Sequence, residues 1–453
     1  MSRRSVSPLF ALFLCGCVFD TRGRDPLSDH TVGLDRPDST TGLDRPLLER
    51  PLHDLSDGSP PDHPRPADHR PADLARDASP CVTPCPLGCF AAMKRCHRLA
   101  PSNADVTAFH DQLAQGVTAS GKLLFNGATG AVSNGATIVR PAGSVGTVQN
   151  GIYFGVVQQG AGYPELAVFG LSSLAVPAGQ ALGVEGARAL VVYVAGDVTL
   201  EGTVTAAPGT AGGFAGGSSG DAPACFGGEG RRGGLSGNEE GGGGGGGRKA
   251  AGGAGGADTS GTPGGNGGAA NGAATLVPLY GGCGGGHGGH SCGGSGGAGG
   301  GALQLSAGGT LSVSGVLSVP GAGGGDGESG TYSCSGGGGG SGGAILLEAA
   351  VLNLASSAVL AANGGGGGGY AAGAAGGAST ANAQGGASNG KTGAGGLGGA
   401  MSPEAGADGQ PGTAGGGGGG GSVGLIRLSS PALKLQSSSL SPAPATSTTV
   451  SVW

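Results

Sequence analysis

The sequence has few of the residues that build a conventional hydrophobic core. Aromatic residues make up 4 % of its 453 positions and charged residues 11 %, whereas glycine alone supplies 110 positions. Glycine loses the most backbone entropy on folding and has no side chain to bury. The composition therefore excludes a large, conventionally packed core.

Basic surfaces are scarce as well. The formal net charge is −6 at pH 7, and no basic stretch alternates with aromatic residues. Binding to nucleic acids depends on clustered Lys and Arg side chains that neutralise phosphates. Nucleic acid is therefore excluded from the expected partners.

The chain also lacks the run of roughly 20 apolar residues that a membrane-spanning helix needs. The short apolar run from Pro8 to Leu14 follows a basic N-terminus, which is the pattern of a signal peptide. It ends in Leu14-Cys15-Gly16-Cys17, and this sequence resembles the lipobox of bacterial lipoproteins. The resemblance implies that residues 1–16 are removed and that Cys17 carries lipid. Ordinary secretion with cleavage nearby is the alternative.

The lipid would hold the chain on a membrane. A diacylglyceryl thioether and an N-acyl chain exceed the two anchoring signals that stable attachment requires. Val18 follows Cys17, whereas Asp at that position retains enterobacterial lipoproteins at the inner membrane. The sequence thus predicts a lipid-anchored protein of the cell envelope, at the outer membrane.

Residues 17–80 are predicted to be a disordered tether. They are rich in Asp, Arg and Pro, and Gly33–Pro37 recurs as Gly42–Pro46. A flexible chain of some 60 residues averages roughly 45 Å from end to end. Such a tether can hold a folded body well clear of the membrane.

Eight cysteines remain once Cys15 leaves with the signal and Cys17 receives lipid. An even number in an exported chain predicts disulfides. Four lie together in residues 81–98 and are expected to pair among themselves, with a zinc site as the alternative, and four lie downstream: Cys81, Cys85, Cys89 and Cys96, then Cys225, Cys283, Cys292 and Cys334. Cys283, His287, His290 and Cys292 form a weaker candidate metal site, because two thiolates and two imidazoles suit zinc.

Aliphatic residues recur in a pattern of offsets 0, 2, 6 and 8. Its copies are Val198, Leu200, Val204 and Ala206; Leu311, Val313, Leu317 and Val319; and Leu352, Leu354, Ala358 and Leu360. Eight residues earlier stand the pairs Leu190/Val192, Leu303/Leu305 and Ala344/Leu346. Looser copies are Leu166/Val168, Leu174/Val176 and Leu182/Val184 upstream, and Leu425 and Leu433/Leu435 downstream.

Offsets of two place side chains on one face of a strand, and each break turns the chain into a new strand. Stacked turns would share an aliphatic ladder that no single turn can bury. The pattern predicts an all-β fold, in which a parallel β-helix or β-solenoid occupies residues 161–442. A strand-rich cap at residues 105–160 precedes it, and a tail at residues 443–453 follows.

Three glycine-rich tracts interrupt the repeats at residues 207–300, 321–343 and 362–422. Each leaves after the third strand of a repeat, so all three should project from the same side of the body. Two alternatives stay open for their structure. They form extended polyglycine strands that exchange backbone hydrogen bonds, or they are disordered.

Several catalytic motifs match by letter but lack their structural setting. Gly385–Thr392 fits the P-loop pattern, yet Gly393–Gly396 cannot form the helix that cradles phosphate. The nucleophile motif G-x-S-x-G recurs, for example around Ser218, Ser295 and Ser341, as a glycine-rich composition produces by chance. We therefore expect no nucleotide, no cofactor and no catalytic residue.

A polysaccharide-active β-helix is the alternative. Such enzymes gather charged side chains on one strand face. The charged residues of the predicted strands show no shared face in the sequence: Arg188, Asp197, Glu201, Glu348, Arg427 and Lys434.

The tracts resemble those of PE-PGRS proteins. Gly252–Asp258 and Gly264–Ala269 carry the GGAGG and GGNGG repeats of that family, and the likeness extends over residues 207–422. The N-terminal Pro-Glu domain of the family is absent, so the resemblance implies only a glycine-rich, surface-associated character. The whole chain resembles glycine-rich envelope lipoproteins of Gram-negative bacteria. These features favour a structural or adhesive protein that contacts polysaccharide or other envelope proteins, with a carbohydrate-binding or carbohydrate-cleaving protein as the alternative.

The anchor can be tested directly. Cys17→Ser removes the thiol that receives lipid, so the protein should move into a soluble fraction and lose labelling by radioactive palmitate. Fractionation of cells that produce either form measures both effects. Unchanged retention in the membrane would contradict the lipoprotein assignment.

Overall fold

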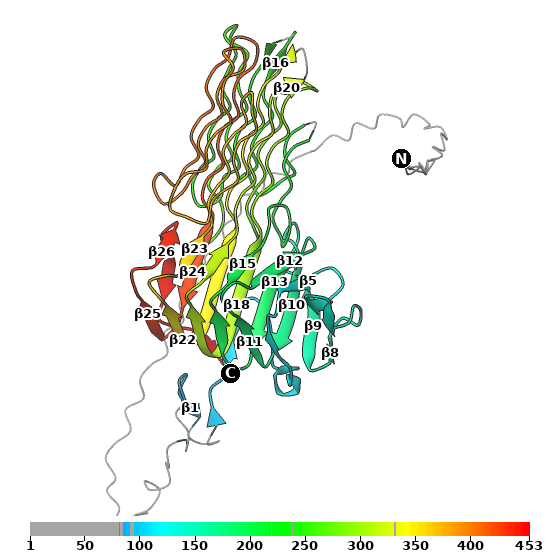
Figure 1. The fold of residues 1–453 in the computed structure, drawn as a ribbon, viewed down its shortest axis with the longest axis vertical. Coiled ribbons are helices and arrows are strands. Elements are labelled where there is room, and N and C mark those ends of the chain that lie inside the picture. Colours follow the sequence, from blue (N-terminus) through cyan, green and yellow to red (C-terminus); the bar gives the residue numbers. More distant parts are fainter. Residues whose placement is uncertain (1–80, 82–84, 91–94, 219, 238, 330–331) are drawn as a thin grey trace, which may run out of the picture. The chain divides into compact units, whose positions relative to one another are not determined.

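The computed structural model describes residues 81–453, apart from residues 82–84, 91–94, 219, 238 and 330–331 (Figure 1). Residues 1–80, which include Cys17 and the predicted tether, lie outside the described residues. The described residues all belong to one compact unit, which lies within Ala72–Trp453.

The described part of the chain is all-β, as predicted. Its only helical element is a single 3₁₀ turn, η1 (His110–Gln112). No described helix is long and apolar enough to cross a membrane.

Two large sheets form what we call the body (Figure 1). The 12-stranded sheet contains, in spatial order, β27 (Ala445–Ser447), β24 (Leu425–Ser429), β22 (Ala344–Leu354), β18 (Ala302–Val313), β13 (Ala189–Val194), β10 (Leu166–Leu171), β9 (Ile152–Val157) and β8 (Thr147–Gln149), with β4 (Gly116–Thr118), β11 (Ser173–Val176), β14 (Val198–Leu200) and β25 (Ala432–Leu435) beside this path. The 8-stranded sheet contains β26 (Ser439–Ser441), β23 (Val359–Ala361), β19 (Val316–Ser318), β15 (Thr203–Thr205), β12 (Ala181–Glu185), β5 (Lys122–Asn126), β6 (Val132–Asn134) and β7 (Thr137–Arg140).

Each repeat contributes three strand segments, two to the larger sheet and one to the smaller. The second segments pair in parallel, and Val198, Leu311, Leu352 and Leu433 stack in one row. All four side chains belong to or pack against the main core between the sheets. The ladder predicted from the aliphatic spacing is therefore confirmed at this position.

The pairing register of the first strand segments differs from the predicted register by one residue in three of the five repeats. Leu303 pairs with Ile345 rather than Ala344, so Ala344 and Leu425, which pair with each other as predicted, lie on the other face of the sheet from Leu303. Upstream, Leu190 pairs with Ala167 and not with Leu166. A shift of one residue moves every side chain to the other face of a strand.

Two features of the structure cause this error. Between Ala307 and Thr310 the strand β18 has one residue more than the paired part of β22. The residues eight positions before Leu311 and Leu352 therefore lie on opposite faces of the sheet. The first segments are also buried on both faces, as in the fully buried pattern of β13. A second cluster covers their outer face: it includes Leu166, Val191, Leu346 and Leu425 under Phe109 and Leu279.

The third segments keep the predicted face but not every predicted partner. Leu317 pairs with Leu360, whereas the sequence pattern aligned it with Ala358. The turn before β23 is two residues longer than the turn before β19, and a shift of two keeps side chains on the same face. Both Ala358 and Leu360 are accordingly buried in the main core.

The ends of the chain close the body. In the predicted cap, β5, β6 and β7 pair antiparallel, as do β8, β9 and β10. The segment predicted to be a tail is instead part of the fold, because β27 extends the 12-stranded sheet and β28 (Ser451–Val452) pairs with β3 (Leu99–Ala100). Near β3, the hairpin of β1 (Cys89–Phe90) and β2 (Arg95–Cys96) carries the disulfides Cys81–Cys89 and Cys85–Cys96.

The ladder predicts a large difference between the inward and outward positions of the second strand segments. Leu352 is fully buried, and Leu352→Asp both removes its packing and buries a carboxylate, so unfolding should become easier by at least about 3 kcal/mol. Thr199 is exposed on β14 beside Val198 of the same row, and Thr199→Asp is the control, with an expected cost below about 1 kcal/mol. Denaturant unfolding measures both, and equal small effects would mean that the row is not a core.

Candidate functional site

The three glycine-rich tracts run side by side as extended chains beyond the ends of the body strands (Figure 1). They leave from β15, β19 and β23 and return into β18, β22 and β24. The regular elements among their described residues are two short hairpins, β16 (Leu235–Ser236) with β17 (Glu239–Glu240) and β20 (Glu328–Ser329) with β21 (Tyr332–Ser333). We call these packed tracts the glycine bundle.

Backbone hydrogen bonds between extended segments of the three tracts hold the bundle together. In the following description each such segment is called a chain of the bundle. Along residues 336–343, every third amide donates to the same neighbouring chain. Gly336, Gly339 and Gly342 donate to Gly416, Gly419 and Ser422; Gly337, Gly340 and Gly343 donate to Gly325, Ala322 and Val319; Gly338 and Ser341 donate to Gly286 and Cys283. A period of three residues is that of an extended polyproline II-type helix, which has no internal hydrogen bonds.

The same segment also accepts hydrogen bonds from three further chains. Its carbonyl groups accept from amides in residues 243–246, 297–300 and 365–368. The central chain therefore has six hydrogen-bonded neighbours. Of the two alternatives for the tracts, the ordered one is found: polyglycine chains that exchange backbone hydrogen bonds.

Only glycine allows the chains to approach this closely. A Cβ added to Gly338 would lie 1.9 Å from the carbonyl oxygen of Gly244, and one added to Gly342 would lie 1.9 Å from that of Ala362. At Gly367 the nearest atom would be the carbonyl oxygen of Gly418, at 2.0 Å. The obstacle is backbone in each case, so no rotation of a side chain can relieve it.

The glycine spacing in the sequence reflects the position of each chain in the bundle. The unbroken run Gly241–Gly247 is buried at every residue, whereas in Gly264–Ala269 only the second glycine of each triplet is fully buried. The third residues of those triplets, Asn266 and Ala269, are exposed. Unbroken glycine thus marks interior chains and the GGx repeat marks edge chains. This signal was present in the sequence and was missed.

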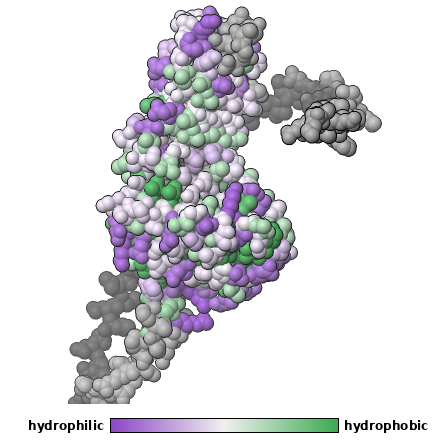
Figure 2. Space-filling view, viewed as in Figure 1, coloured by the Kyte–Doolittle hydropathy of each residue, from purple (hydrophilic) through white to green (hydrophobic). Residues whose placement is uncertain are grey.

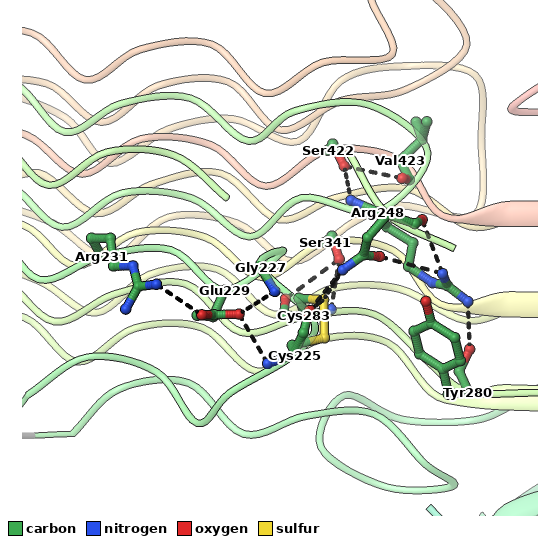
Figure 3. Close-up of a disulfide and its surroundings, with 11 residues drawn as sticks. Cys225, Gly227, Glu229, Arg231, Arg248, Tyr280, Cys283, Ser341, Ser422 and Val423 are labelled. Carbon is green, nitrogen blue, oxygen red and sulfur yellow. Dashed lines mark hydrogen bonds and ion pairs between the residues drawn. A yellow bond between two sulfur atoms is a disulfide. The ribbon is translucent and has the colours of Figure 1, made fainter. Parts of the chain in front are cut away.

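Two disulfides cross the bundle. Cys225 pairs with Cys283 within the first tract (Figure 3). Cys292 of that tract pairs with Cys334 of the second. They close loops of 58 and 42 residues. Crosslinks of that length restrict the unfolded chain by about 4 kcal/mol each in the chain-entropy description.

These disulfides contradict the candidate metal site. Cys283 and Cys292 belong to different disulfides, so neither offers a thiolate. The buried His287 places its Nδ1 2.6 Å from the carbonyl oxygen of Gly288. Glu240, His290 and Cys292 do lie within 4.8 Å of one another, but the buried Glu240 carboxylate accepts the amide of Ser335.

Buried charges fix the chains around the first disulfide (Figure 3). Glu229 accepts the amides of Cys225 and Gly227 at 2.9 and 3.0 Å and pairs with Arg231 at 3.0 Å. Arg248 is almost fully buried, and its guanidinium lies 3.7 Å above the ring of Tyr280 and donates to the Tyr280 carbonyl. Burial lowers the pKa of Arg248 to about 10, which leaves it charged at neutral pH.

The catalytic motifs are structural parts of the bundle. Thr392 of the P-loop pattern is buried and donates to the carbonyl of Cys334, and Gly393 to Gly399 continue as a bundle chain rather than a helix. Ser341 is buried as well, and its hydroxyl accepts the amide of Cys283 at 2.8 Å. Both hydroxyls are therefore used in packing.

Four of the six charged residues considered for polysaccharide chemistry have separate partners within the protein. Arg188 pairs with Glu165, and Asp197 accepts the amide of Thr310. Arg427 donates to the carbonyl of Ala274. Glu348 is buried and accepts hydrogen bonds from Ser102, Gln304 and Ser306.

The remaining two, Glu201 and Lys434, line one groove of about 380 Å³ on the body. It crosses β14, β18, β22 and β25, and we call it the polar groove. Its lining includes Thr199, Ser312, Asn353 and Gln436. The sequence alone does not bring these residues together, although all of them lie at or just after outward positions of the confirmed ladder.

The close packing of glycine predicts a contrast within one tract. Gly367→Ala places a methyl group against backbone and should destabilise the bundle by about 2 kcal/mol or more, as overpacked interiors do. A Cβ at Gly377 would meet only the Ser379 hydroxyl, at 3.4 Å, so Gly377→Ala is the matched control. Hydrogen exchange of bundle amides measures both. Equal protection in the two variants would contradict ordered packing.

Comparison of the chain with protein-family models, with curated proteins and with solved structures found no match. The resemblance of the tracts to PE-PGRS repeats therefore stays a prediction. The function is inferred from the geometry of the body, the bundle and the polar groove.

Proposed function

We propose that this protein is a lipid-anchored, non-catalytic component of the bacterial cell envelope, in which a β-solenoid body displays the glycine bundle as a structural or adhesive element. The observation that carries the proposal is the bundle itself. Three tracts far apart in sequence form one hydrogen-bonded and disulfide-crosslinked assembly.

The body suits a display role. Parallel pairing of β13, β18, β22 and β24 stacks successive repeats in register, which supports the β-solenoid interpretation. Because each tract leaves and re-enters the body at equivalent strands, the ladder sets the tracts side by side at the spacing of parallel strands, about 4.8 Å. The body is thus a base that aligns the bundle chains.

The bundle suits contact rather than catalysis. Its interior chains consist of backbone, and its exposed positions carry small residues such as Asn266, Ala269 and Ala374. On the face shown in Figure 2, the upper part of the molecule is mostly white and pale green with purple patches, the hydropathy of Gly, Ala and small polar residues. Such a surface fits envelope polysaccharide or other envelope proteins as partners.

The polar groove bears on the alternative function, which is carbohydrate binding or carbohydrate cleavage. Glycosidic hydrolysis by the common mechanism requires two carboxyl groups that flank one bond. The lining of this groove contains a single carboxylate, Glu201, and no aromatic side chain. The groove therefore favours binding over cleavage.

Proteolysis of intact cells tests the display role. Trypsin cleaves after Arg and Lys except before Pro, and the segment 18–80 offers such bonds after Arg22, Arg24 and Arg76. We expect rapid release of a resistant fragment that retains the bundle and the C-terminus, because Arg248 is buried and the backbone amides of the exposed Arg231 and Lys391 are held in hydrogen bonds. Mass spectrometry of the released material identifies the fragment.

An intact periplasmic marker protein is the control for cell integrity. Cleavage that occurs only after lysis would contradict display at the surface. Rapid degradation within residues 207–422 would contradict a rigid bundle.

A further inference from the structure

The polar groove repeats one arrangement on four successive turns of the body. Thr199 pairs with Ser312, Ser312 with Asn353, and Asn353 with Lys434, all in parallel register. Their neighbours in sequence, such as Leu311 and Leu352, point into the core. The four polar side chains therefore point outward as a row that crosses the strands.

A second row lies at the ends of the same strands. Glu201 and Ser314 follow β14 and β18, and Gln436 follows β25. Together the two rows line the groove with hydroxyl, amide, ammonium and carboxylate groups. Glu201 lies on the first of the four turns and Lys434 on the last, so opposite charges stand at the two ends of the groove.

These side chains form no hydrogen bonds with the protein. Among the described residues, no hydrogen bond or ion pair involves the side chains of Thr199, Ser312, Asn353 or Lys434. The side-chain oxygen Oδ1 of Asn353 is shielded from solvent and has no hydrogen-bond partner. The outer face of the first strand segments behaves differently, because Gln304, Ser306 and Glu348 are linked to one another. Hydrogen-bonding capacity is thus concentrated in the groove.

We propose that the polar groove binds a linear oligosaccharide that lies across the four strands. Adjacent parallel strands are about 4.8 Å apart, so the row presents a polar group at intervals comparable to the length of one sugar ring, over about 14 Å in total. A polyhydroxylated chain can both donate to and accept from hydroxyl and amide groups at each interval. A groove that repeats along its length suits a polymer better than a compact small molecule.

This inference goes beyond the proposed function, because it concerns the body and not the bundle. Loss of sugar binding would leave surface exposure and bundle rigidity unchanged. The two proposals therefore fail independently.

Calorimetric titration of the purified full-length protein tests the inference. The probes are cellohexaose, chitohexaose and hexagalacturonate, which differ in acetamido and carboxylate groups but share a linear form. We expect saturable binding of at least one probe. Asn353→Ala should weaken it by about tenfold, which corresponds to the loss of one or two hydrogen bonds.

Ser312→Phe, which fills the groove, should abolish binding. Thr203→Ala is the matched control, since Thr203 is an exposed threonine on the neighbouring strand β15 of the same repeat as Thr199. This variant should bind as the unmodified protein does. Unfolding curves establish that all three variants are folded.

Absence of binding to all three probes at millimolar concentration would overturn the proposal. Undiminished binding by the folded Asn353→Ala and Ser312→Phe variants would overturn it as well. Preference for hexagalacturonate would support the proposal and assign Lys434 as its cationic contact.

Discussion

The structure depends on the close approach of glycine backbones. Where carbonyl oxygens lie within about 2 Å of the position of a neighbouring Cβ, as at Gly338 and Gly367, chains can hydrogen-bond in six directions at once. A strand in a sheet has two such neighbours. The bundle therefore replaces side-chain burial with a dense network of backbone hydrogen bonds.

Such a network cannot assemble easily by itself. Ordering one residue costs about 1–2 kcal/mol of backbone entropy, and one hydrogen bond contributes only about 0.5–1.5 kcal/mol net. Polyglycine has no side chains whose hydrophobic burial could offset the remaining entropic cost. The aliphatic ladder of the body supplies that hydrophobic burial, because β18, β22 and β24 hold the ends of three chains in register. The disulfides Cys225–Cys283 and Cys292–Cys334 then reduce the entropy of the unfolded tracts.

The body combines two surfaces of different character. The outer face of the first strand segments is sealed by Phe109, Leu279 and the network around Glu348. The outer face of the second segments is open and carries unpaired polar groups from Thr199 to Lys434. One repeat can in this way support both the alignment of the bundle and a groove for a linear ligand.

The sequence by itself determined the all-β class, the ladder through Val198, Leu311 and Leu352, and the points at which the tracts leave the body. These features are visible because one face of the second strand segment is buried and the other is not, so hydrophobicity alternates. Only the tertiary structure decided the register of the first segments, where Ile345 and not Ala344 faces the main core. Both faces of these segments are buried, so the hydrophobicity of a residue does not indicate the face on which its side chain lies.

The pairing of the cysteines and the order of the tracts were likewise decided by tertiary structure. Cys283 meets Cys225 because the chains fold back beside each other, a contact that no local pattern specifies. Polyglycine has no side chain to show which face meets a neighbour. The order of the tracts depends on backbone contacts between segments far apart in sequence, and these contacts exist only once the body has aligned the chains.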